Sequence, residues 1–394
     1  MVSNMEPTYI ALGEVADVTK LAGFEFTKYI NYNDTGEIIA LRALNLRHGE
    51  LDLGDIKRID KEVSDFLSRS KLFINDILLT YTGNGYGDCA LIRENDKYHL
   101  APNICKITPD PQKINPYFLY SYIRGKEFYQ QMSNHMVGSS QPTIPMKTIR
   151  LLEVPLLSME IQKKIVSIIF SLDEKIRTNQ AINDNLLEQA QALYNQCFPF
   201  RVNDDLPMGW RIGTVGEIIE IHDSKRIPLS GAERAKMEKK TYPYYGAAAL
   251  MDYVDDYIFD GIYLLLGEDG TVVDEAGYPI LQYVWGKFWV NNHAHILTGK
   301  LGYNVESLYM LFKQTPVKAI VTGAVQPKIS QANLRSIQVV IPPQKLVMDY
   351  NNQIAPLFTL MRTNEEANKS LAVLRDTLLP KLMSGEIDVS GIQL

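Results

Sequence analysis

The residues of this sequence that could carry out chemistry lie in short stretches, of which the first is rich in glycine. Gly83, Gly85 and Gly87 follow the apolar run 77–81, and a glycine-rich loop after a strand can hold a nucleotide or a methyl donor. Their spacing is not G-x-G-x-x-G, no acidic residue stands out at the distance that a dinucleotide-binding fold requires, and no G-x-x-x-x-G-K-[ST] occurs. We therefore interpret these glycines as a turn at the end of a strand.

Two further stretches resemble parts of catalytic or metal sites. Asn115-Pro116-Tyr117 is similar to the N-P-P-Y of amino-methyltransferases but lacks the second proline. Asn followed by Pro is typical of a helix start, so we predict a helix that carries Tyr117 to Ile123. His293 and His295 could bind a metal, yet no Cys or third His is spaced to complete the site. The sequence thus predicts neither a catalytic site nor a metal site.

These residues belong to a chain with the composition of a globular protein. Its 394 residues, 46% of them hydrophobic, suffice for two or three domains with separate cores. The net charge of -6 and the pI near 5.6 exclude nucleic-acid binding through bulk positive charge. Selective binding of nucleic acid would therefore need local basic patches or a partner that supplies positive charge.

Cysteine usage and hydropathy indicate the compartment. Cys89, Cys105 and Cys197 are odd in number and not closely spaced, which favours neither a disulfide framework nor a zinc site. No apolar run approaches the roughly 20 residues that span a bilayer, and the N-terminus lacks the layout of a signal peptide. We expect a cytoplasmic protein without a membrane segment.

One long stretch of the chain occurs twice. Residues 138–196 align without a gap on residues 323–381. The residues shared by the two copies are Gly138/Gly323, Gln141/Gln326, Pro142/Pro327, Ile144/Ile329, Arg150/Arg335, Val154/Val339, Leu172/Leu357, Arg177/Arg362, Thr178/Thr363, Asn179/Asn364, Leu186/Leu371 and Leu193/Leu378. A repeat of this length predicts two similar modules.

The second half of each copy has the periodicity of a coiled-coil helix. In the first copy, steps of three and four residues connect Ile161, Ile165, Ile168, Leu172, Asn179, Ile182, Leu186 and Leu193. The second copy has Leu346, Tyr350, Leu357, Leu360, Asn364, Ala367, Leu371, Leu374 and Leu378. Asn179 and Asn364 share one seam position, where a buried amide fixes register and partner. We predict that the two helices pack on each other; the alternative is two unrelated surface helices.

The remaining segments read as short strands with a few helices, so the predicted fold class is mixed α/β (α+β). Val215-Gly216-Glu217-Ile218 begins the second such segment as Leu12-Gly13-Glu14-Val15 begins the first. The predicted order is a first domain at 1–155, a helix at 156–200, a second domain at 201–340, and a second helix with a C-terminal tail at 341–394. The two domains are expected to be related but diverged.

Several motifs in this order resemble the specificity subunit (HsdS) of type I restriction-modification enzymes. They are Gly138 to Ile144, Glu153-Val154-Pro155-Leu156, the long helix with its second copy, Tyr242 to Ala247, Gly267-Glu268-Asp269-Gly270, and Trp289 to His295. The resemblance covers nearly the whole chain. The first domain departs most from the family pattern, with Tyr81-Thr82-Gly83-Asn84 and Ala101-Pro102-Asn103 in the corresponding places.

The resemblance implies a protein that recognises DNA without catalysing a reaction. In this family two target recognition domains each read one half of a split, asymmetric DNA site, and two antiparallel helices set the spacing and dock the methyltransferase subunits. The implied partners are double-stranded DNA, two methyltransferase subunits and restriction subunits. The implied cofactors, S-adenosylmethionine and ATP with magnesium, belong to those subunits, and none is bound by this chain.

Base readers should lie where the two modules differ, because shared residues cannot distinguish the two half-sites. The candidates are Arg42, Asn45, Tyr81 and Asn84 in the first domain, and Lys225, Arg226, Tyr245, Asp269, Asn292 and His293 in the second. Arg and Lys suit guanine, Asn suits adenine, and Asp can accept from cytosine. Within the repeated turn, Ser140, Gln141, Gln326 and Lys328 are expected to shape the loop or contact the DNA backbone.

Two other readings remain open from the sequence. The chain could be a coiled-coil scaffold or decoy subunit that binds protein but not DNA. A single-chain enzyme with a fused methyltransferase is a third option, which the missing methyl-donor and N-P-P-Y motifs disfavour. Two diverged, aromatic-rich domains joined by matched helices favour two-part DNA reading.

Overall fold

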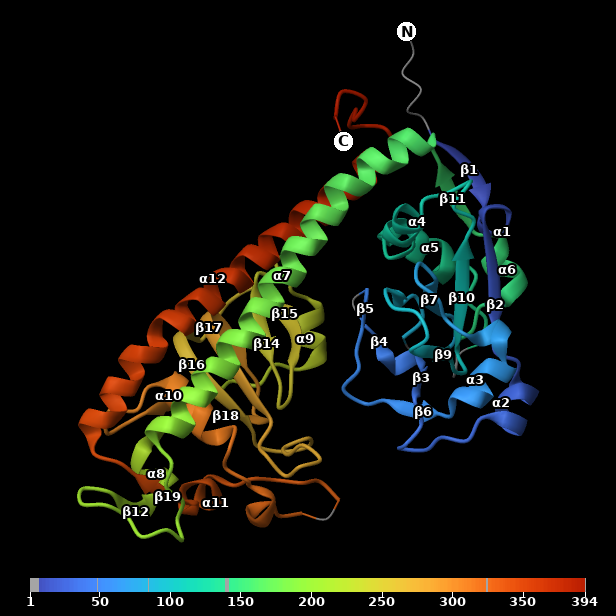
Figure 1. Ribbon diagram of the computed structural model, residues 1–394. Helices are drawn as coiled ribbons and strands as arrows, with labels where there is room; N and C mark the ends of the chain where they lie inside the picture. The colour runs from blue at the N-terminus through green and yellow to red at the C-terminus, as the bar shows by residue number, and fades with distance from the viewer. Residues whose placement is uncertain (1–6, 48, 84, 139–141, 324, 394) are drawn as a thin grey trace. The chain divides into compact units, whose positions relative to one another are not determined.

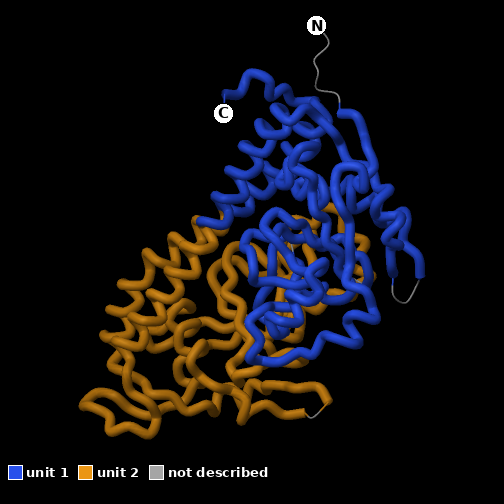
Figure 2. The backbone as a smooth tube through the Cα atoms, turned by 45° about the vertical axis from the view of Figure 1, so that its right-hand side comes forward, with its two compact units in different colours: residues 1–178, 367–394 blue, residues 179–366 orange. Residues whose placement is uncertain are grey.

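Two long helices, α7 (Met159–Cys197) and α12 (Gln344–Met383), follow the two repeated turns in this computed structural model (Figure 1). The structure describes residues 7–47, 49–83, 85–138, 142–323 and 325–393. The chain folds as two compact units, with residues 1–178 and 367–394 in unit 1 and residues 179–366 in unit 2 (Figure 2). Since the division falls inside both long helices, each unit contains one mixed domain and part of each helix.

The mixed domain of unit 1 is built from small sheets and short helices. Its central sheet has the order β2 (Ala16–Lys20), β10 (Ile104–Pro109), β7 (Ile77–Thr80), β8 (Cys89–Leu91). The other sheets are β1 (Thr8–Ala11) with β11 (Glu153–Leu156); β6 (Lys57–Ile59), β3 (Ile38–Leu41) and β9 (Tyr98–Leu100); and β4 (Leu46–Arg47) with β5 (Glu50–Leu51). The α-helices are α1 (Leu12–Val15), α2 (Gly23–Tyr29), α3 (Lys61–Phe66), α4 (Pro116–Ile123), α5 (Lys126–Asn134) and α6 (Met146–Leu151).

The mixed domain of unit 2 has one larger sheet. Its order is β13 (Ile219–Ile221), β18 (Ala294–Gly299), β16 (Phe259–Gly267), β17 (Leu281–Val290), β14 (Tyr242–Tyr245), β15 (Leu250–Val254). A separate pair joins β12 (Arg211–Thr214) to β19 (Gln338–Ile341). The α-helices are α8 (Val215–Ile218), α9 (Gly231–Ala235), α10 (Val305–Phe312) and α11 (Gln331–Ser336), and η3 (Asp223–Lys225) is a short 3-10 helix.

The two domains share one plan. The order β2-β10-β7-β8 of unit 1 corresponds to β13-β18-β16-β17 of unit 2, and the pair β1-β11 corresponds to β12-β19. In each domain the residues just before the central sheet form a short helix that packs against a second short helix, α1 against α6 and α8 against α11. The predicted mixed α/β class with two related modules and two long helices is confirmed.

The helix predicted after Asn115 is also confirmed. The Asn115 side chain accepts hydrogen bonds from the backbone N–H groups of Tyr117 and Phe118, and Pro116 occupies the first turn of α4. Such a cap satisfies two of the donors that a helix start leaves unpaired, and it contributes about 1 kcal/mol.

Within each unit, the parts of α7 and α12 run antiparallel and share a core with the mixed domain. In unit 1, Ile161, Ile165 and Ile169 of α7 belong to the same apolar cluster as Leu379 and Leu382 of α12. In unit 2, the α7 residues of the corresponding cluster are Ala190 and Tyr194, and those of α12 are Val347, Tyr350, Ile354 and Phe358. Burying one such large apolar side chain stabilises the fold by about 1.5–3 kcal/mol.

The predicted phase of the coiled-coil seam is wrong at several positions. Ile182, Leu360 and Leu374 are 39%, 45% and 46% exposed, whereas Ile169 and Phe358 are fully buried. The reason is that each helix must cover the mixed domain as well as the other helix. Four-residue steps such as Tyr350, Ile354 and Phe358 therefore replace the alternating steps of a simple coiled coil.

A buried ionic cluster ties the long helices to the domain of unit 1. Asp173 of α7 accepts hydrogen bonds from Tyr117 at 2.5 Å, from Arg124 at 2.5 Å and from Arg375 of α12 at 2.9 Å. Burial alone raises the pKa of Asp173, but the charge and hydrogen bonds of Arg124 together with the other donors leave this pKa below its usual value. Asp173 thus joins α4, α7 and α12.

Unit 2 uses a different ionic group for the same purpose. Arg362 of α12 contacts the Tyr283 hydroxyl of β17 and donates to Glu306 Oε1 of α10 at 3.1 Å. Tyr283 also donates to Glu306 at 2.8 Å.

None of the helices in the described part of the chain is both long and apolar enough to cross a membrane.

Candidate nucleic-acid interface

Four loops of unit 2 meet around the guanidinium of Arg226, which follows η3. Arg226 Nη1 donates to the carbonyl oxygen of Asn292 at 3.2 Å, in the loop between β17 and β18, and to that of Ala294 at 2.8 Å, at the start of β18. The same atom lies 2.6 Å from Glu268 Oε2, in the loop after β16. Lys328 of the repeated turn reaches Glu268 Oε1 at 3.3 Å. Charged groups thus hold the four loops at one place.

Backbone hydrogen bonds attach the repeated turn to the strand-end loop in both units. Gly270 donates to the Pro327 carbonyl at 3.0 Å, and Gly83 donates to the Pro142 carbonyl at 2.9 Å. Both glycines have positive φ, +85° and +92°, which a residue with a side chain rarely adopts. The interpretation of the glycines after residue 81 as a strand-end turn is confirmed for the described residues.

Three of the predicted readers in unit 2 are held by other groups. His293 Nδ1 faces Asp269 Oδ1 in a short contact, and the His293 backbone N–H donates to Asn291 at 2.8 Å. The side chain of Arg226 is only 13% exposed. These contacts hold the His293 ring and the Arg226 guanidinium in one orientation. Selective recognition of a ligand requires side chains that are held in this way.

The other predicted residues of unit 2 are more accessible. Lys225, Asn292, Gln326 and Lys328 are exposed. Tyr245 is half-buried with its ring edge-on to Phe288 at 5.9 Å between centroids, and burial raises the pKa of its hydroxyl to about 12. The backbone of Lys328 forms an antiparallel β-bridge with that of Asp269. Its ammonium lies 3.3 Å from Glu268 Oε1, so Lys328 belongs to the ionic group as well as to the turn.

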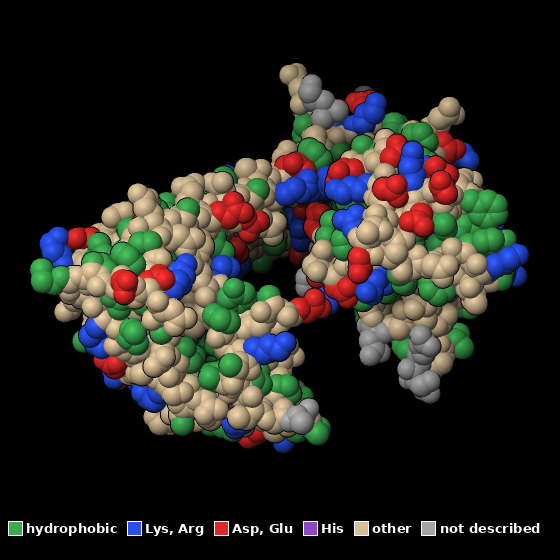
Figure 3. Space-filling model, turned by 60° about the horizontal axis from the view of Figure 1, so that its bottom comes forward, with side chains coloured by type: hydrophobic (Ala, Val, Ile, Leu, Met, Phe, Trp, Pro, Cys, Tyr) green, Lys and Arg blue, Asp and Glu red, His purple; other side chains and the backbone are tan. Residues whose placement is uncertain are grey.

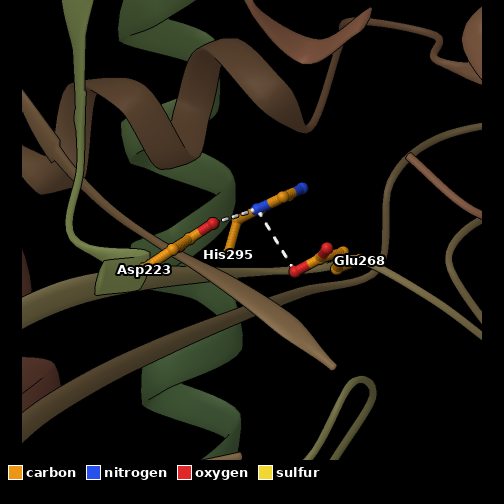
Figure 4. A group of neighbouring side chains, drawn as sticks. All are labelled: Asp223, Glu268 and His295. Carbon is orange, nitrogen blue, oxygen red and sulfur yellow. Dashed lines mark hydrogen bonds and ion pairs between the residues drawn. The ribbon is translucent and has the colours of Figure 1, made fainter. Parts of the chain in front are cut away.

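A buried pair lies beneath these loops, between Asp223 of η3 and His295 of β18 (Figure 4). His295 Nδ1 is 2.6 Å from Asp223 Oδ2 and 3.7 Å from Glu268 Oε2. Burial alone would raise the pKa of Asp223, but hydrogen bonds from His295 and Ile296 and the charge of Arg226 leave it lowered. Asp223 is therefore a carboxylate at neutral pH.

Asp223, Glu268 and His295 also have donor atoms within 4.8 Å of one another, the spacing of a possible metal site. Every oxygen or nitrogen atom that could bind a metal here, however, already has a hydrogen-bond or ion-pair partner in the chain. Asp223 accepts from Gln331 at 2.7 Å, Glu268 pairs with Arg226, and His295 Nε2 faces the Ile329 carbonyl at 2.8 Å. The Arg226 guanidinium offsets the negative charge of both carboxylates, as a metal cation would, so we assign no metal to this group.

In unit 1 the predicted readers Arg42 and Asn45 hold one loop. Asn45 is fully buried, its amide nitrogen donates to the carbonyls of Asp52 and Asp55, and its oxygen accepts from the Arg42 backbone at 3.0 Å. Arg42 pairs with Asp55 at 2.9 Å, and its side chain is 21% exposed. Asn45 thus shapes the loop, and its amide has no group left for DNA in this conformation.

The structure describes only some of the other residues of unit 1 that were predicted to bind DNA. Tyr81 is 9% exposed, and the Lys20 ammonium lies 5.4 Å from the centre of its ring. Asn84, Ser140 and Gln141 lie outside the described residues. Near the same turn, the rings of Tyr86 and Tyr129 stack 5.2 Å apart, and Tyr129 is 45% exposed. No sequence pattern indicates this stack, because the two tyrosines are far apart in the chain.

The predicted register residues Asn179 and Asn364 both have interaction partners. Asn364 Nδ2 donates to Asn183 Oδ1 at 2.9 Å, and Asn183 Nδ2 donates to the Met361 carbonyl at 3.2 Å, all in unit 2. Asn179 is 1% exposed and also has an interaction partner. The helix pair thus contains buried amides. Asn183 and its equivalent in the second copy, Asn368, are 6% and 7% exposed and were not predicted as register residues.

The charged groups that matter most in unit 2 were only partly visible in the sequence. Asp223 and Glu268 are not among the residues predicted from the sequence to bind DNA, although Asp223 precedes Arg226 by three residues. Positive and negative side chains are interspersed on the face drawn in Figure 3. Since a prediction from charge sign alone looks for basic residues, it misses carboxylates that orient them.

Comparisons with known proteins all find members of one family. The model of a family described as type I restriction modification DNA specificity domain matches residues 5–188 and 207–367. The type I restriction enzyme MjaIX specificity subunit of Methanocaldococcus jannaschii is 24% identical over 305 residues, covering 70% of each chain. The HindI specificity subunit of Haemophilus influenzae is 20% identical over 462 residues, covering 92% of this chain and 96% of that one.

A solved structure has the same fold. The S subunit of a type I restriction-modification system from M. genitalium superposes with a TM-score of 0.54 at 17% identity, and the match covers 97% of both chains. At this identity the likeness concerns the fold alone.

Proposed function

Because the chain belongs to the family of type I restriction-modification DNA specificity subunits, we propose that it reads a two-part DNA site, one half with each mixed domain. The observation that carries this proposal is that one module occurs twice with the same strand order and repeated turn but with different residues in its loops. Two modules that share a fold but differ in their loop residues are suited to recognising two different half-sites.

The loops of unit 2 support direct reading of base edges. Lys225 and Asn292 are exposed, while Arg226, Glu268 and Asp269 fix the loops that carry them. Exposed ammonium and amide groups match the donor and acceptor pattern of the major groove. A scaffold without DNA contact would not need such a preorganised polar group, so we disfavour that alternative.

We further propose that the chain is non-catalytic and acts in the cytoplasm within a larger complex. Two methyltransferase subunits dock on the long helices, where Val373 of unit 1 and Leu360 of unit 2 are 68% and 45% exposed. Restriction subunits join the same complex. S-adenosylmethionine and ATP with magnesium would be bound by those partners, which would also supply positive charge that the acidic chain lacks.

Methylome sequencing tests the proposed function. We expect one split, asymmetric motif to be methylated in the host and to lose methylation when this gene is deleted. The purified chain should methylate no DNA with S-adenosylmethionine until the methyltransferase subunits are added. Methylation by the chain alone, or an unchanged methylome in the deletion strain, would refute the proposal.

A further inference from the structure

Helix α5 (Lys126–Asn134) lies beside α4 in unit 1 (Figure 1), with one face buried and the other exposed. On the buried face, Phe128 and Met132 have no exposed surface. On the other face, Lys126, Gln130 and Asn134 are exposed, and steps of four residues place them in one row along the helix. Within the described part of the chain, neither the Gln130 nor the Asn134 amide has a hydrogen-bond partner. The helix therefore presents two unused amides outside the domain.

Contacts on two sides hold α5 in a fixed position. On one side, the Gln131 side chain donates to the Glu153 carbonyl at 3.0 Å and accepts from the Glu153 N–H at 2.9 Å. On the other, the Tyr129 ring stacks on Tyr86 of the strand-end loop, with 5.2 Å between the ring centres. A Cβ atom at Gly87 would lie 2.6 Å from the Tyr129 ring, so glycine at this position permits the stack. The exposed amides thus have the rigid support that selective recognition requires.

The surface of α5 is continuous with the repeated turn of unit 1. The chain runs from α5 directly into this turn, where Val137 and Thr143 exchange backbone hydrogen bonds of 3.1 and 3.0 Å. Thr143 also forms a β-bridge with Thr82 of the strand-end loop. The sequence predicts that this turn shapes the loop or contacts the DNA backbone. DNA bound at the turn would therefore lie beside the end of α5.

The second module has no counterpart of α5. Helix α4 of unit 1 corresponds to α10 of unit 2, because each follows the strand at the same place in the sheet order, β10 and β18. Between α10 and α11 the described residues contain no α-helix, only the short 3-10 helix η4 (Lys318–Ile320). Shared residues cannot distinguish two half-sites, so an element present in one module alone is suited to base reading. The repeat does not reveal α5, since it begins at residue 138, after this helix.

We infer that α5 enters the major groove of the half-site read by unit 1, where Gln130 and Asn134 read adenine. The inference rests on the proposed function of two-part reading. A helix of nine residues is about 13 Å long, and the major groove, about 12 Å wide, admits an α-helix. The amide of Gln or Asn pairs with both N6 and N7 of adenine. Lys126 lies in the same row and supplies a positive charge for a phosphate, whereas the Glu127 charge lies near Tyr9 of β1.

The test begins by assigning the half-sites. A chain in which residues 1–155 come from a relative with a different first domain is expressed with the methyltransferase subunits of this system. Methylome sequencing should show one half of the methylated motif changed and the other half retained. The changed half is the one that unit 1 reads. A motif with both halves retained would refute the proposed function itself.

Binding by the assembled methyltransferase complex then tests the two amides. Competition anisotropy compares the full site with a duplex whose unit 1 half is scrambled. We expect Gln130→Ala and Asn134→Ala each to weaken binding to the full site about tenfold, the effect of losing one base contact, and to leave binding to the scrambled duplex unchanged. Alanine favours a helix more than Gln or Asn does, so α5 stays folded.

Gln112→Ala is the matched control. It removes an exposed amide of the same domain, in the segment that follows the C-terminal end of β10. The strand-end loop adjoins the other end of β10, where Ile104 pairs with Thr80. Gln112→Ala should therefore change binding to neither duplex.

A change in the DNA identifies the contacted atom. 7-Deazaadenine keeps Watson–Crick pairing and the N6 amino group but has carbon in place of the N7 acceptor. It replaces each adenine of the unit 1 half in turn. We expect wild-type binding to weaken roughly three- to tenfold at the adenine that Gln130 reads, the effect of losing one hydrogen bond. At that position the Gln130→Ala variant should lose nothing further, because its contact is already missing.

The outcomes separate this inference from the proposed function. A loss confined to the full site, with one adenine position at which the amide variant is insensitive to 7-deazaadenine, supports the inference. Equal loss on both duplexes, unchanged affinity, additive losses, or a unit 1 half without an A·T pair overturns it and leaves two-part reading intact. Wild-type binding that tolerates 7-deazaadenine at every position overturns it even if a variant does not fold.

Discussion

At the scale of single residues, the loops of unit 2 divide polar side chains into two kinds. Arg226 contacts two carboxylates and three carbonyls, so its charge is used inside the protein. Lys225, its neighbour in sequence, is exposed, as is Asn292. A held residue orients the loops, whereas an exposed ammonium or amide is free to contact DNA.

Lys225 and Asn292 should therefore have different effects when substituted. Lys225→Gln removes a mobile charge, so we expect weaker binding to all DNA and a salt dependence reduced by about one ion. Asn292→Ala removes a group able to read adenine, so we expect a loss of about 1–3 kcal/mol for the unit 2 half-site alone. Binding to specific and scrambled duplexes at several salt concentrations measures both. Equal loss on all DNA for Asn292→Ala would make it a phosphate contact.

The sequence predicts which chemical groups these loops carry, but not which of those groups the fold uses internally. Asn45 was selected because an amide suits adenine, but its burial depends on the carbonyls of Asp52 and Asp55, which no local pattern reveals. Arg226 is a predicted base reader, yet its guanidinium pairs with Glu268, which lies 42 residues away in the chain. Sequence shows which chemistry is available, and only the fold shows which groups it leaves free.

At the scale of elements, the long helices are held to their domains by ionic groups that differ between units. Unit 1 uses Asp173 on α7, and unit 2 uses Arg362 on α12. The repeat predicted both long helices, and Asn115-Pro116 predicted the cap of α4, since these depend on local pattern. It did not predict the phase at Ile182 or Leu360, because packing against the domain competes with packing against the other helix.

Asp173→Asn should destabilise unit 1 selectively. It leaves Arg124 and Arg375, 13% and 20% exposed, without their shared negative partner, which costs about 3 kcal/mol. Calorimetry of the full chain should show the transition of unit 1 lowered by roughly 6–12 °C. Arg362→Gln is the matched change in unit 2 and should lower the other transition. If both variants lower the same transition, the two clusters do not stabilise separate units.

The same carboxylate gives unit 1 a defined response to acid. Because the pKa of Asp173 in the folded protein is lowered, its stabilisation is present above the unfolded value of about 3.9. It is lost as the pH falls through the lower folded value. The difference in melting temperature between wild type and Asp173→Asn should therefore shrink on acidification into this window and stay constant near neutral pH.

At the scale of the whole molecule, each module contributes one of the two long helices. We therefore expect the length of these helices to set the distance between the two half-sites. The two units divide between residues 178 and 179 in α7 and between residues 366 and 367 in α12. Insertions at these two points lengthen both helices without entering either domain. A heptad adds about 10 Å of helix, or roughly 3 base pairs of DNA, and nearly restores the helical phase.

We expect a chain with one heptad after Thr178 and another after Glu366 to methylate a motif with both half-sites intact and about 3 more unspecified base pairs between them. Inserting five residues at the same points is the control, because it turns the helix faces by about 140° and breaks the packing. That control should lose methylation altogether. Methylome sequencing of strains that carry each variant reads the spacing directly. A heptad variant that stays active with the original spacing would mean that the helices do not measure the distance between the half-sites.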